Sequence, residues 1–209
     1  MKLLHAPTSP FVRKVMVVAL ETGLTERIEI VFNAASPLQR DPALTALNPL
    51  GKIPALVLDD GTALYDSAVI CEYLANLAGD TTLFPAPGPA RWQALTLQAL
   101  GDGLLDAAVG NRYESVMRPA ELRWPDWSQA QMAKIAGGLD AIEQAAHTGV
   151  IGPTLHHIGL ITLGCALGYL DFRYAEMGWR EGRPATAEWF AAFEERPAMA
   201  ATRPHERAA

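Results

Sequence analysis

Cysteine is scarce in this sequence, and its scarcity argues against a fold held together by disulfides or by a cysteine-based metal site. The two cysteines, Cys71 and Cys165, lie inside apolar patterns with helical spacing, and neither belongs to a Cys-x-x-Cys or Cys/His cluster. No metal site is therefore expected. With 209 residues the chain can bury a substantial core without disulfides, so we expect both thiols to be reduced and buried in a cytoplasmic protein.

The sequence also lacks an excess of positive charge and a long hydrophobic run. A formal net charge of −6 argues against nucleic acid as a partner. The longest apolar run, Ile158 to Leu170, is shorter than the roughly 20 residues that a membrane-spanning helix needs. Residues 1–4 lead into a strand pattern instead of a signal peptide. We expect a cytoplasmic protein with no membrane partner, whose partner is a small molecule or another protein.

The first 78 residues carry both strand and helix patterns. Residues 33–49 are predicted to form a polar, proline-containing connection, and Asp59-Asp60-Gly61 is a hairpin turn. Strands are predicted at Lys2–His5, Ile28–Phe32, Ala55–Leu58 and Thr62–Leu64, and helices at Phe11–Leu20 and Ser67–Ala78. The first two strands should be parallel, with a right-handed crossover. This order resembles the thioredoxin-like α/β arrangement, which predicts an N-terminal domain over residues 1–78.

From residue 90 onward only helical patterns remain. Residues 79–89, with three prolines, are predicted to be a linker, and residues 90–209 an all-helical C-terminal domain. The segment Ile158–Leu170 is apolar nearly all round, as a central buried helix would be, and the tail Ala198–Ala209 should be frayed. The predicted helices are Ala90–Met117, Ser128–Ala146, Ile158–Asp171 and Ala185–Glu195.

A proline opens the predicted strand at residues 55–58. Proline cannot donate a hydrogen bond to a sheet, so it belongs at a strand's first residue or on an edge. The Ile53–Pro54 bond is a candidate for the cis isomer, which would expose the main chain of Ile53. An exposed main chain at the start of a strand can pair with an extended peptide.

Two segments around this proline carry a family resemblance. Residues 48–56, Asn-Pro-Leu-Gly-Lys-Ile-Pro-Ala-Leu, and residues 65–74, Tyr-Asp-Ser-Ala-Val-Ile-Cys-Glu-Tyr-Leu, resemble the glutathione-binding segment of cytosolic glutathione S-transferases in order and spacing. Residues 163–173 look like the central helix of the bacterial members. The resemblance implies the thioredoxin-like domain followed by the helical domain, with glutathione as co-substrate. It also implies a homodimer, paired through the helix at Ala90–Asp106, that acts in detoxification.

Ser9 is the residue on which the predicted chemistry depends. A serine followed by Pro10 is typical of a helix start, with the serine as N-cap. In serine-type members of the family the matching serine stabilises the glutathione thiolate, and the resemblance implies the same catalytic role for Ser9, with Thr8 as the competing residue. Lowering a thiol pKa of about 8.5 by two units needs about 2.7 kcal/mol. A charge-assisted hydrogen bond of about 1.5–3 kcal/mol with a helix dipole of about 0.3–1 kcal/mol can supply it.

The resemblance also assigns the glutathione-binding residues. Asp66 would face the α-ammonium of the γ-glutamyl end and Ser67 would hold its carboxylate, although capping of the third helix explains the same pair. Lys52 would neutralise the glycyl carboxylate, although an exposed lysine is by default a solvated charge. The full predicted set is Phe11, Lys52, Ile53, Pro54, Asp66 and Ser67.

A hydrolase is rejected, and two other kinds of function stay open beside transfer of glutathione to a small, electrophilic, apolar molecule. A hydrolase built on Ser9 is disfavoured because no Gly-x-Ser-x-Gly elbow surrounds it. A glutathione-dependent isomerase or dehalogenase would use the same thiolate. A non-catalytic adaptor resembling the stringent starvation proteins would use none. The electrophile pocket should be lined by residues such as Asp106, Asn111 and Tyr113, which match no specific motif.

The start of the central helix departs from the family pattern. Family members open this helix with a Ser/Thr-x-x-Asp capping box, whereas residues 157–160 here are His-Ile-Gly-Leu. Thr154, three residues earlier, is the alternative cap.

Overall fold

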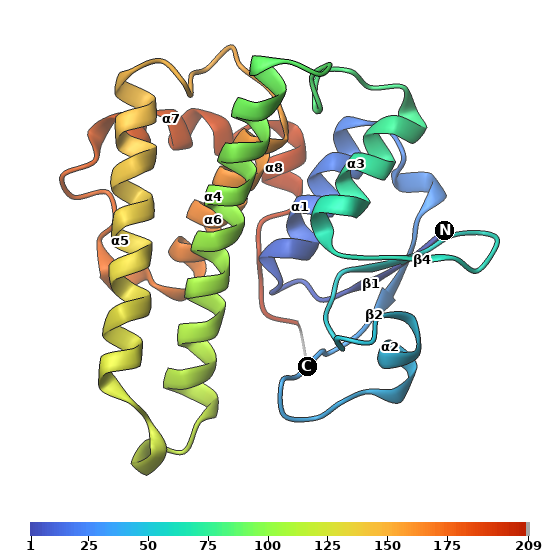
Figure 1. Cartoon of the computed structure of the whole chain (residues 1–209), viewed down its shortest axis with the longest axis horizontal. Coiled ribbons are helices and arrows are strands. Elements are labelled where there is room, and N and C mark those ends of the chain that lie inside the picture. The colour runs from blue at the N-terminus through green and yellow to red at the C-terminus, as the bar shows by residue number, and fades with distance from the viewer. Residues whose placement is uncertain (208–209) are drawn as a thin grey trace. The chain divides into compact units, whose positions relative to one another are not determined.

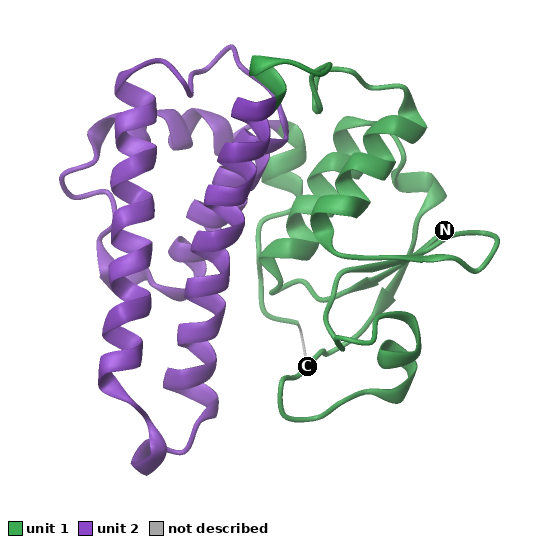
Figure 2. Ribbon diagram, in the orientation of Figure 1, with its two compact units in different colours: residues 1–91, 197–209 green, residues 92–196 purple. Residues whose placement is uncertain are grey.

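The computed structural model describes residues 1–207, and these form two compact units. Residues 1–91 and the C-terminal residues 197–207 make the first unit, and residues 92–196 make the second (Figure 2). None of the described helices is both long enough and apolar enough to cross a membrane.

The first unit is built on a four-stranded sheet. Its strands are β1 (Lys2–His5), β2 (Glu29–Phe32), β3 (Ala55–Val57) and β4 (Ala63–Leu64), in the order β2-β1-β3-β4. β1 is parallel to β2 and antiparallel to β3, and β3 is antiparallel to β4. All four predicted strands are confirmed, and so is the parallel pairing of the first two.

Helices cover both faces of this sheet. α1 (Pro10–Glu21) and α3 (Ser67–Ala78) pack together on one face, and α2 (Pro42–Leu47) lies on the other (Figure 1). Because side chains alternate along a strand, Leu3 and Leu4 point to opposite faces. Leu4 joins Leu44 of α2 and Ala55 in one buried cluster. The thioredoxin-like α/β fold predicted for this part of the chain is confirmed.

The helix α2 lies inside the stretch that the sequence pattern predicted to be irregular. Asp41 is its N-cap and accepts a hydrogen bond from the Ala43 amide at 2.9 Å, Pro42 follows the cap, and Leu44 is buried. With six residues the helix is too short for a 3.6-residue periodicity to be visible in the sequence.

The prediction of a frayed tail is wrong for residues 198–201. Pro197–Ala201 form α8, which packs on α1 with Ala198 and Met199 buried. The buried Arg13 of α1 donates a hydrogen bond from Nη2 to the Met199 carbonyl at 3.0 Å. A contact between residues so far apart in the chain leaves no local pattern. Residues 208–209 lie outside the described residues.

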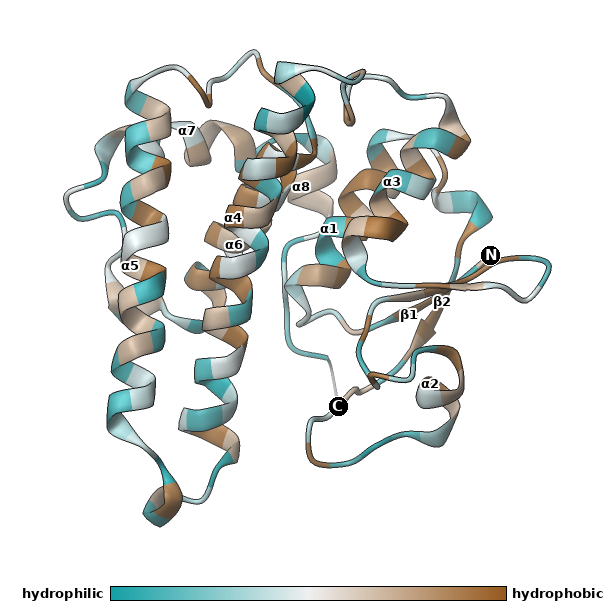
Figure 3. Ribbon diagram, viewed as in Figure 1, coloured by the Kyte–Doolittle hydropathy of each residue, from teal (hydrophilic) through white to brown (hydrophobic). Residues whose placement is uncertain are grey.

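The second unit contains four long helices. Its central helix, α6 (Ile158–Arg173), is buried at every position from Ile158 to Leu170, as predicted. α5 (Pro125–His147) alternates between hydrophilic and hydrophobic residues along its length (Figure 3), as a helix with one buried face should. The other three are α4 (Pro89–Arg112, whose first residues belong to the first unit), α5 (Pro125–His147) and α7 (Pro184–Glu194). Short helical turns lie at Tyr113–Met117, Ala120–Leu122 and Ala175–Met177.

Two helix starts in this unit depend on unusual partners. His157, not Thr154, is the N-cap of α6, and its side chain makes no capping hydrogen bond, so the expectation for Thr154 is wrong. At α7 the start is held from outside, because Glu143 of α5 accepts hydrogen bonds from the Ala185 amide at 3.1 Å and the Thr186 amide at 2.7 Å. Gly159 lets α4 and α6 approach closely, since a Cβ there would lie 2.5 Å from the Ala94 carbonyl oxygen.

Candidate functional site

Ser9 lies in the loop between β1 and α1. Its amide donates a hydrogen bond to the Ala6 carbonyl at 3.1 Å, and its Oγ accepts one from the Val12 amide at 3.3 Å. Ser9 is therefore the N-cap of α1, with Pro10 next in the chain, as the sequence predicted. The Ser9 hydroxyl acts here as an acceptor, so its own proton can still be donated to an anion beside the helix N-terminus.

Three other residues lie close to Ser9 in the sequence, namely His5, Thr8 and Phe11. Thr8 is half-buried and caps no helix, and Phe11 is half-buried in the first turn of α1. His5, at the end of β1, is half-buried, and burial together with the nearby charge of His205 lowers the pKa of its imidazole. A neutral His5 adds no positive charge beside Ser9 near neutral pH.

The loop before β3 is held by Asn48, which the sequence reasoning did not single out. Asn48 is buried, donates from Nδ2 to the Lys52 carbonyl at 2.8 Å, and accepts the Leu50 amide at 3.1 Å. Gly51 has φ of +65°, a left-handed conformation that favours glycine. Asparagine, proline and glycine in residues 48–51 are the turn signal that could have revealed this role. Lys52 itself is exposed.

The Ile53–Pro54 peptide bond is cis, as predicted. Pro54 is buried, and β3 begins at the next residue, Ala55, which pairs with Leu4 of β1. The main-chain N–H and C=O of Ile53 form no hydrogen bond with any described residue. They are the free pairing groups that an extended peptide needs.

Asp66 and Ser67 begin α3. Asp66 is the N-cap and accepts a hydrogen bond from the Ala68 amide at 3.0 Å, so the capping interpretation is confirmed. Ser67 is 2% exposed, and its hydroxyl makes no hydrogen bond with the described residues. The Tyr65–Asp66 peptide bond is cis as well.

Strand directions bring these segments to one edge of the sheet. β1 and β3 are antiparallel with Leu4 opposite Ala55, so the loop that carries Ser9 and the loop that carries Pro54 leave the same edge. β4 is antiparallel to β3, with Leu64 opposite Leu56, so the start of α3 follows at that edge too. Ser9, Ile53 and the Asp66–Ser67 pair, far apart in the sequence, are thereby neighbours along one sheet edge.

Arg40 is a second cation at the loop of Lys52. Its Nη2 donates a hydrogen bond to the Pro49 carbonyl at 2.7 Å. No pattern in the sequence distinguishes this arginine, because it lies in an irregular stretch without periodicity. In the part of the chain that the structure describes, no group of three or more His, Cys, Asp or Glu side chains could hold a metal ion.

In the second unit, the residues expected to line an electrophile pocket have different surroundings. Asn111 is buried and donates from Nδ2 to the Tyr174 hydroxyl at 3.4 Å, which ties α4 to the end of α6. Tyr113 is 40% exposed, and burial of the rest of its ring raises the pKa of its hydroxyl. Asp106 is exposed.

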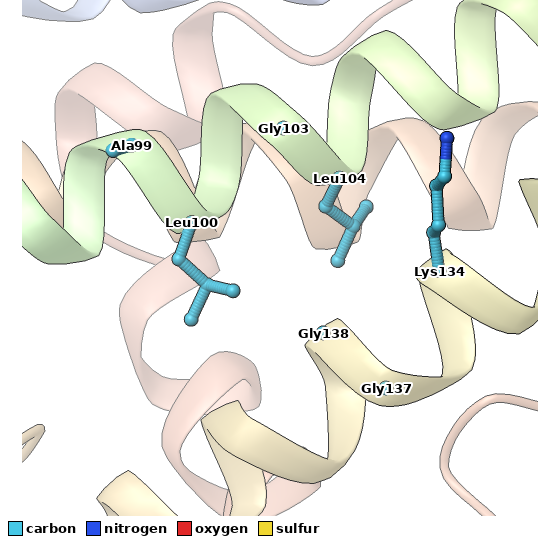
Figure 4. A pocket seen from close by; sticks show the side chains of 7 residues that line it. All are labelled: Ala99, Leu100, Gly103, Leu104, Lys134, Gly137 and Gly138. Carbon is cyan, nitrogen blue, oxygen red and sulfur yellow. The ribbon is translucent and has the colours of Figure 1, made fainter.

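A cleft of about 310 Å³ lies between α4 and α5 (Figure 4). Lys134 supplies its one charged group, and Leu104 reaches toward Gly138 from the opposite helix. The cleft contains none of the residues at the sheet edge. It is lined by Ala99, Leu100, Gly103, Leu104, Lys134, Gly137 and Gly138.

The thioredoxin-like unit with its sheet-edge loops, followed by an all-helical unit, defines the architecture of glutathione-dependent transferases. The sequence matches the family "Glutathione S-transferase, N-terminal domain" over residues 8–77 and "Glutathione S-transferase, C-terminal domain" over residues 125–192. It is 32% identical, over 98% of both chains, to the uncharacterized GST-like protein YibF of Escherichia coli K12. The chain belongs to the glutathione S-transferase family.

Solved structures of the family agree with this assignment. A glutathione transferase family member from Pseudomonas fluorescens Pf-5 with bound glutathione has a TM-score of 0.93 and 45% identity, over 98% of each chain. Another structure of a family member from the same organism, with bound S-(propanoic acid)-glutathione, has a TM-score of 0.88 and 44% identity, over 98% of this chain and 100% of that one.

Proposed function

We propose that this protein binds glutathione at the sheet edge and catalyses attack of its thiolate on a small electrophile with an apolar body. The observation that carries the proposal is the unpaired main chain of Ile53 between two helix N-termini, at Ser9 and at Asp66–Ser67. Glutathione is an extended tripeptide that has near its middle a thiol, which must ionise to react, and at one end a zwitterionic γ-glutamyl group. One edge of the sheet thus offers a main chain for pairing and two positive helix N-termini, one for the thiolate and one for the γ-glutamyl carboxylate.

Each predicted glutathione-binding residue would have a role in this arrangement, through its side chain or, for Ile53, through its main chain. The cysteinyl amide groups would pair with Ile53, the γ-glutamyl carboxylate would lie at Ser67, and the α-ammonium would lie at Asp66. Lys52, joined by Arg40, would neutralise the glycyl carboxylate, while Phe11 and Pro54 would supply apolar walls.

The hydroxyl of Ser9 would donate a hydrogen bond to the sulfur and lower its pKa. In the reaction the thiolate forms a C–S bond to the electrophilic carbon, while a leaving group departs with its electron pair or a proton adds to the neighbouring carbon. We further propose that the protein acts as a cytoplasmic homodimer in detoxification, as the family resemblance implies.

The ligands of the similar structures support this assignment. The Pseudomonas fluorescens relatives were solved with bound glutathione and with S-(propanoic acid)-glutathione. A propanoic acid group on sulfur is a three-carbon acid, formed when a thiolate adds to an unsaturated acid or displaces halide from a halogenated one. An isomerase or a dehalogenase would use the same thiolate with a different electrophile.

Binding to immobilised glutathione tests the proposal. We expect the protein to be retained on a glutathione column and eluted by free glutathione. Passage straight through the column would favour the non-catalytic adaptor, because an adaptor needs no glutathione.

A further inference from the structure

The described end of the chain crosses the carboxyl ends of β1 and β2. We define residues Arg203–Arg207 as the C-terminal strap. The strap leaves α8 at Thr202, whose Oγ1 lies 3.5 Å from Nε of Arg13 on α1. At its other end the guanidinium carbon of Arg207 lies 4.0 Å from the centre of the Phe32 ring, at the end of β2. In Figure 1 the strap is the red segment that runs down past α1.

Between these two points the strap passes the end of β1. His205 lies near enough to His5 for its charge to affect the titration of that imidazole. His5 and Phe32 are themselves partners in the register of β1 and β2. The strap therefore spans two neighbouring strand ends at the edge from which the Ser9 loop departs.

The distance from this crossing to Ser9 is short. Ala6 follows His5, and the Ser9 amide bonds to the Ala6 carbonyl at 3.1 Å, which closes a four-residue turn. A turn of this kind keeps its end Cα atoms within about 7 Å, and adjacent Cα atoms are about 3.8 Å apart. The Cα atoms of His5 and Ser9 are thus at most about 11 Å apart, so the strap crosses the end of β1 close in the chain to the place proposed for the sulfur.

Arg207 is suited to hold an anion at this place. Its guanidinium lies against the Phe32 ring, and its N–H groups form no hydrogen bond or ion pair with the described residues. Stacking restricts the orientation of the plane and leaves the edge donors free, and that fork matches a carboxylate. The strap also carries Arg203 and His205 against a single acid, Glu206. The exposed ring of Phe32 and the exposed side chain of Ile30 on the same strand supply apolar surface.

We propose that Arg207, stacked on Phe32, binds a carboxylate of the second substrate, so that the protein selects small electrophiles that carry a carboxylate a few atoms from the reacting carbon. The assignment rests on the proposed function, because it places the glutathione sulfur at Ser9. Arg207 is then a specificity-determining residue, and Phe32 is the residue that positions it.

Calorimetric titration with matched S-conjugates tests the assignment without relying on turnover. The probes are glutathione, S-(propanoic acid)-glutathione, and S-(propanamide)-glutathione, whose substituent on sulfur has the same shape but carries no charge. The parent should bind the acid about tenfold more tightly than the amide, the size expected of one charge-assisted hydrogen-bonded pair. Arg207→Gln should abolish this preference and leave the affinity for glutathione itself unchanged.

Arg27→Gln is the matched control. Arg27 is an exposed arginine of the same unit, just before β2, at the opposite end of the strand that ends at Phe32. This variant should keep the full preference for the acid. Phe32→Leu should reduce the preference, because the guanidinium loses its stacking surface.

Three results would overturn the assignment. Equal affinities of the parent for acid and amide would do so, as would a preference that survives Arg207→Gln. If Arg207→Gln weakened glutathione and both conjugates equally, Arg207 would be holding a carboxylate of glutathione instead. Failure of the proposed function has a different signature, because the parent would then bind none of the three ligands.

Discussion

Ser9 is the N-cap of α1 and the proposed stabiliser of the thiolate, and the physical requirements of these two roles are separable. As N-cap it accepts a hydrogen bond from the Val12 amide, and this role needs an acceptor or a backbone that tolerates the cap conformation. As thiolate stabiliser it must donate its proton to sulfur. Substitutions at this one position can remove the donor while keeping most of the cap, because glycine caps a helix nearly as well as serine but has no hydroxyl.

Ser9→Gly and Ser9→Ala together distinguish the two roles. Ser9→Ala should lower the free energy of unfolding by about 0.5–2 kcal/mol, and Ser9→Gly by only a few tenths. Both should raise the pKa of bound glutathione by roughly one to two units, since each loses a hydrogen bond of about 1.5–3 kcal/mol to the thiolate. Thiolate absorbance against pH measures the shift. If both variants keep the parental titration curve, Ser9 is only a cap, and Thr8 becomes the candidate.

At the residue scale, residues typical of turns and strand starts predicted more of the local structure of the site than charged residues did. Proline at the start of β3 predicted the cis bond at Ile53–Pro54, because few arrangements tolerate proline there. Arg40 was missed since its partner, the Pro49 carbonyl, is a main-chain group that any sequence would present.

At the scale of elements, long and strongly patterned segments were predictable and short or distant ones were not. The predicted bounds Ser67–Ala78 are those of α3, because Asp66 caps its start and Gly79 ends it in a left-handed conformation. The helices α2 and α8 were missed. α2 is too short to show a period, and α8 is stabilised by Arg13, far away in the sequence.

The start of α6 is an element whose stability should depend on pH. His157 is 8% exposed, its Nδ1 has no hydrogen-bond partner among the described residues, and it occupies the N-cap without capping. Burial, followed by the nearby charge of His156, lowers the pKa of His157 from its ordinary value of 6.5. The folded state therefore binds this proton less readily than the unfolded state. The stability that a neutral His157 contributes is present above pH 6.5 and is lost as the pH falls from 6.5 through the lowered pKa.

His157→Asn should reduce that pH dependence. Asparagine does not titrate, and its side-chain oxygen can cap the free amides of the first turn, a gain of about 1 kcal/mol. We expect the variant to be more stable than the parent at pH 5.5, with a smaller difference between about pH 7.5 and pH 5.5. Urea unfolding at the two pH values measures both effects. An unchanged loss of stability in the variant would mean that another group titrates.

At the scale of the whole molecule, the proposed homodimer needs an apolar surface that the units do not use for themselves. On α4, the helix expected to meet its partner through residues 90–106, Trp92 is such a group, since 63% of its surface is exposed. In a two-fold dimer each substitution acts twice, because the same patch serves both subunits. Light scattering at micromolar concentration should give twice the chain mass of 22.5 kDa for the parent.

Trp92→Glu should shift this mass toward that of one chain. A tryptophan in the centre of an interface often contributes about 2 kcal/mol or more, and burying a carboxylate in its place costs further free energy. Trp124→Glu is the matched control, because Trp124 is 61% exposed but lies just before α5, outside the expected interface helix. The control should stay dimeric. A parent mass of 22.5 kDa would contradict the dimer itself, whereas dissociation by Trp124→Glu with none by Trp92→Glu would place the interface at the start of α5.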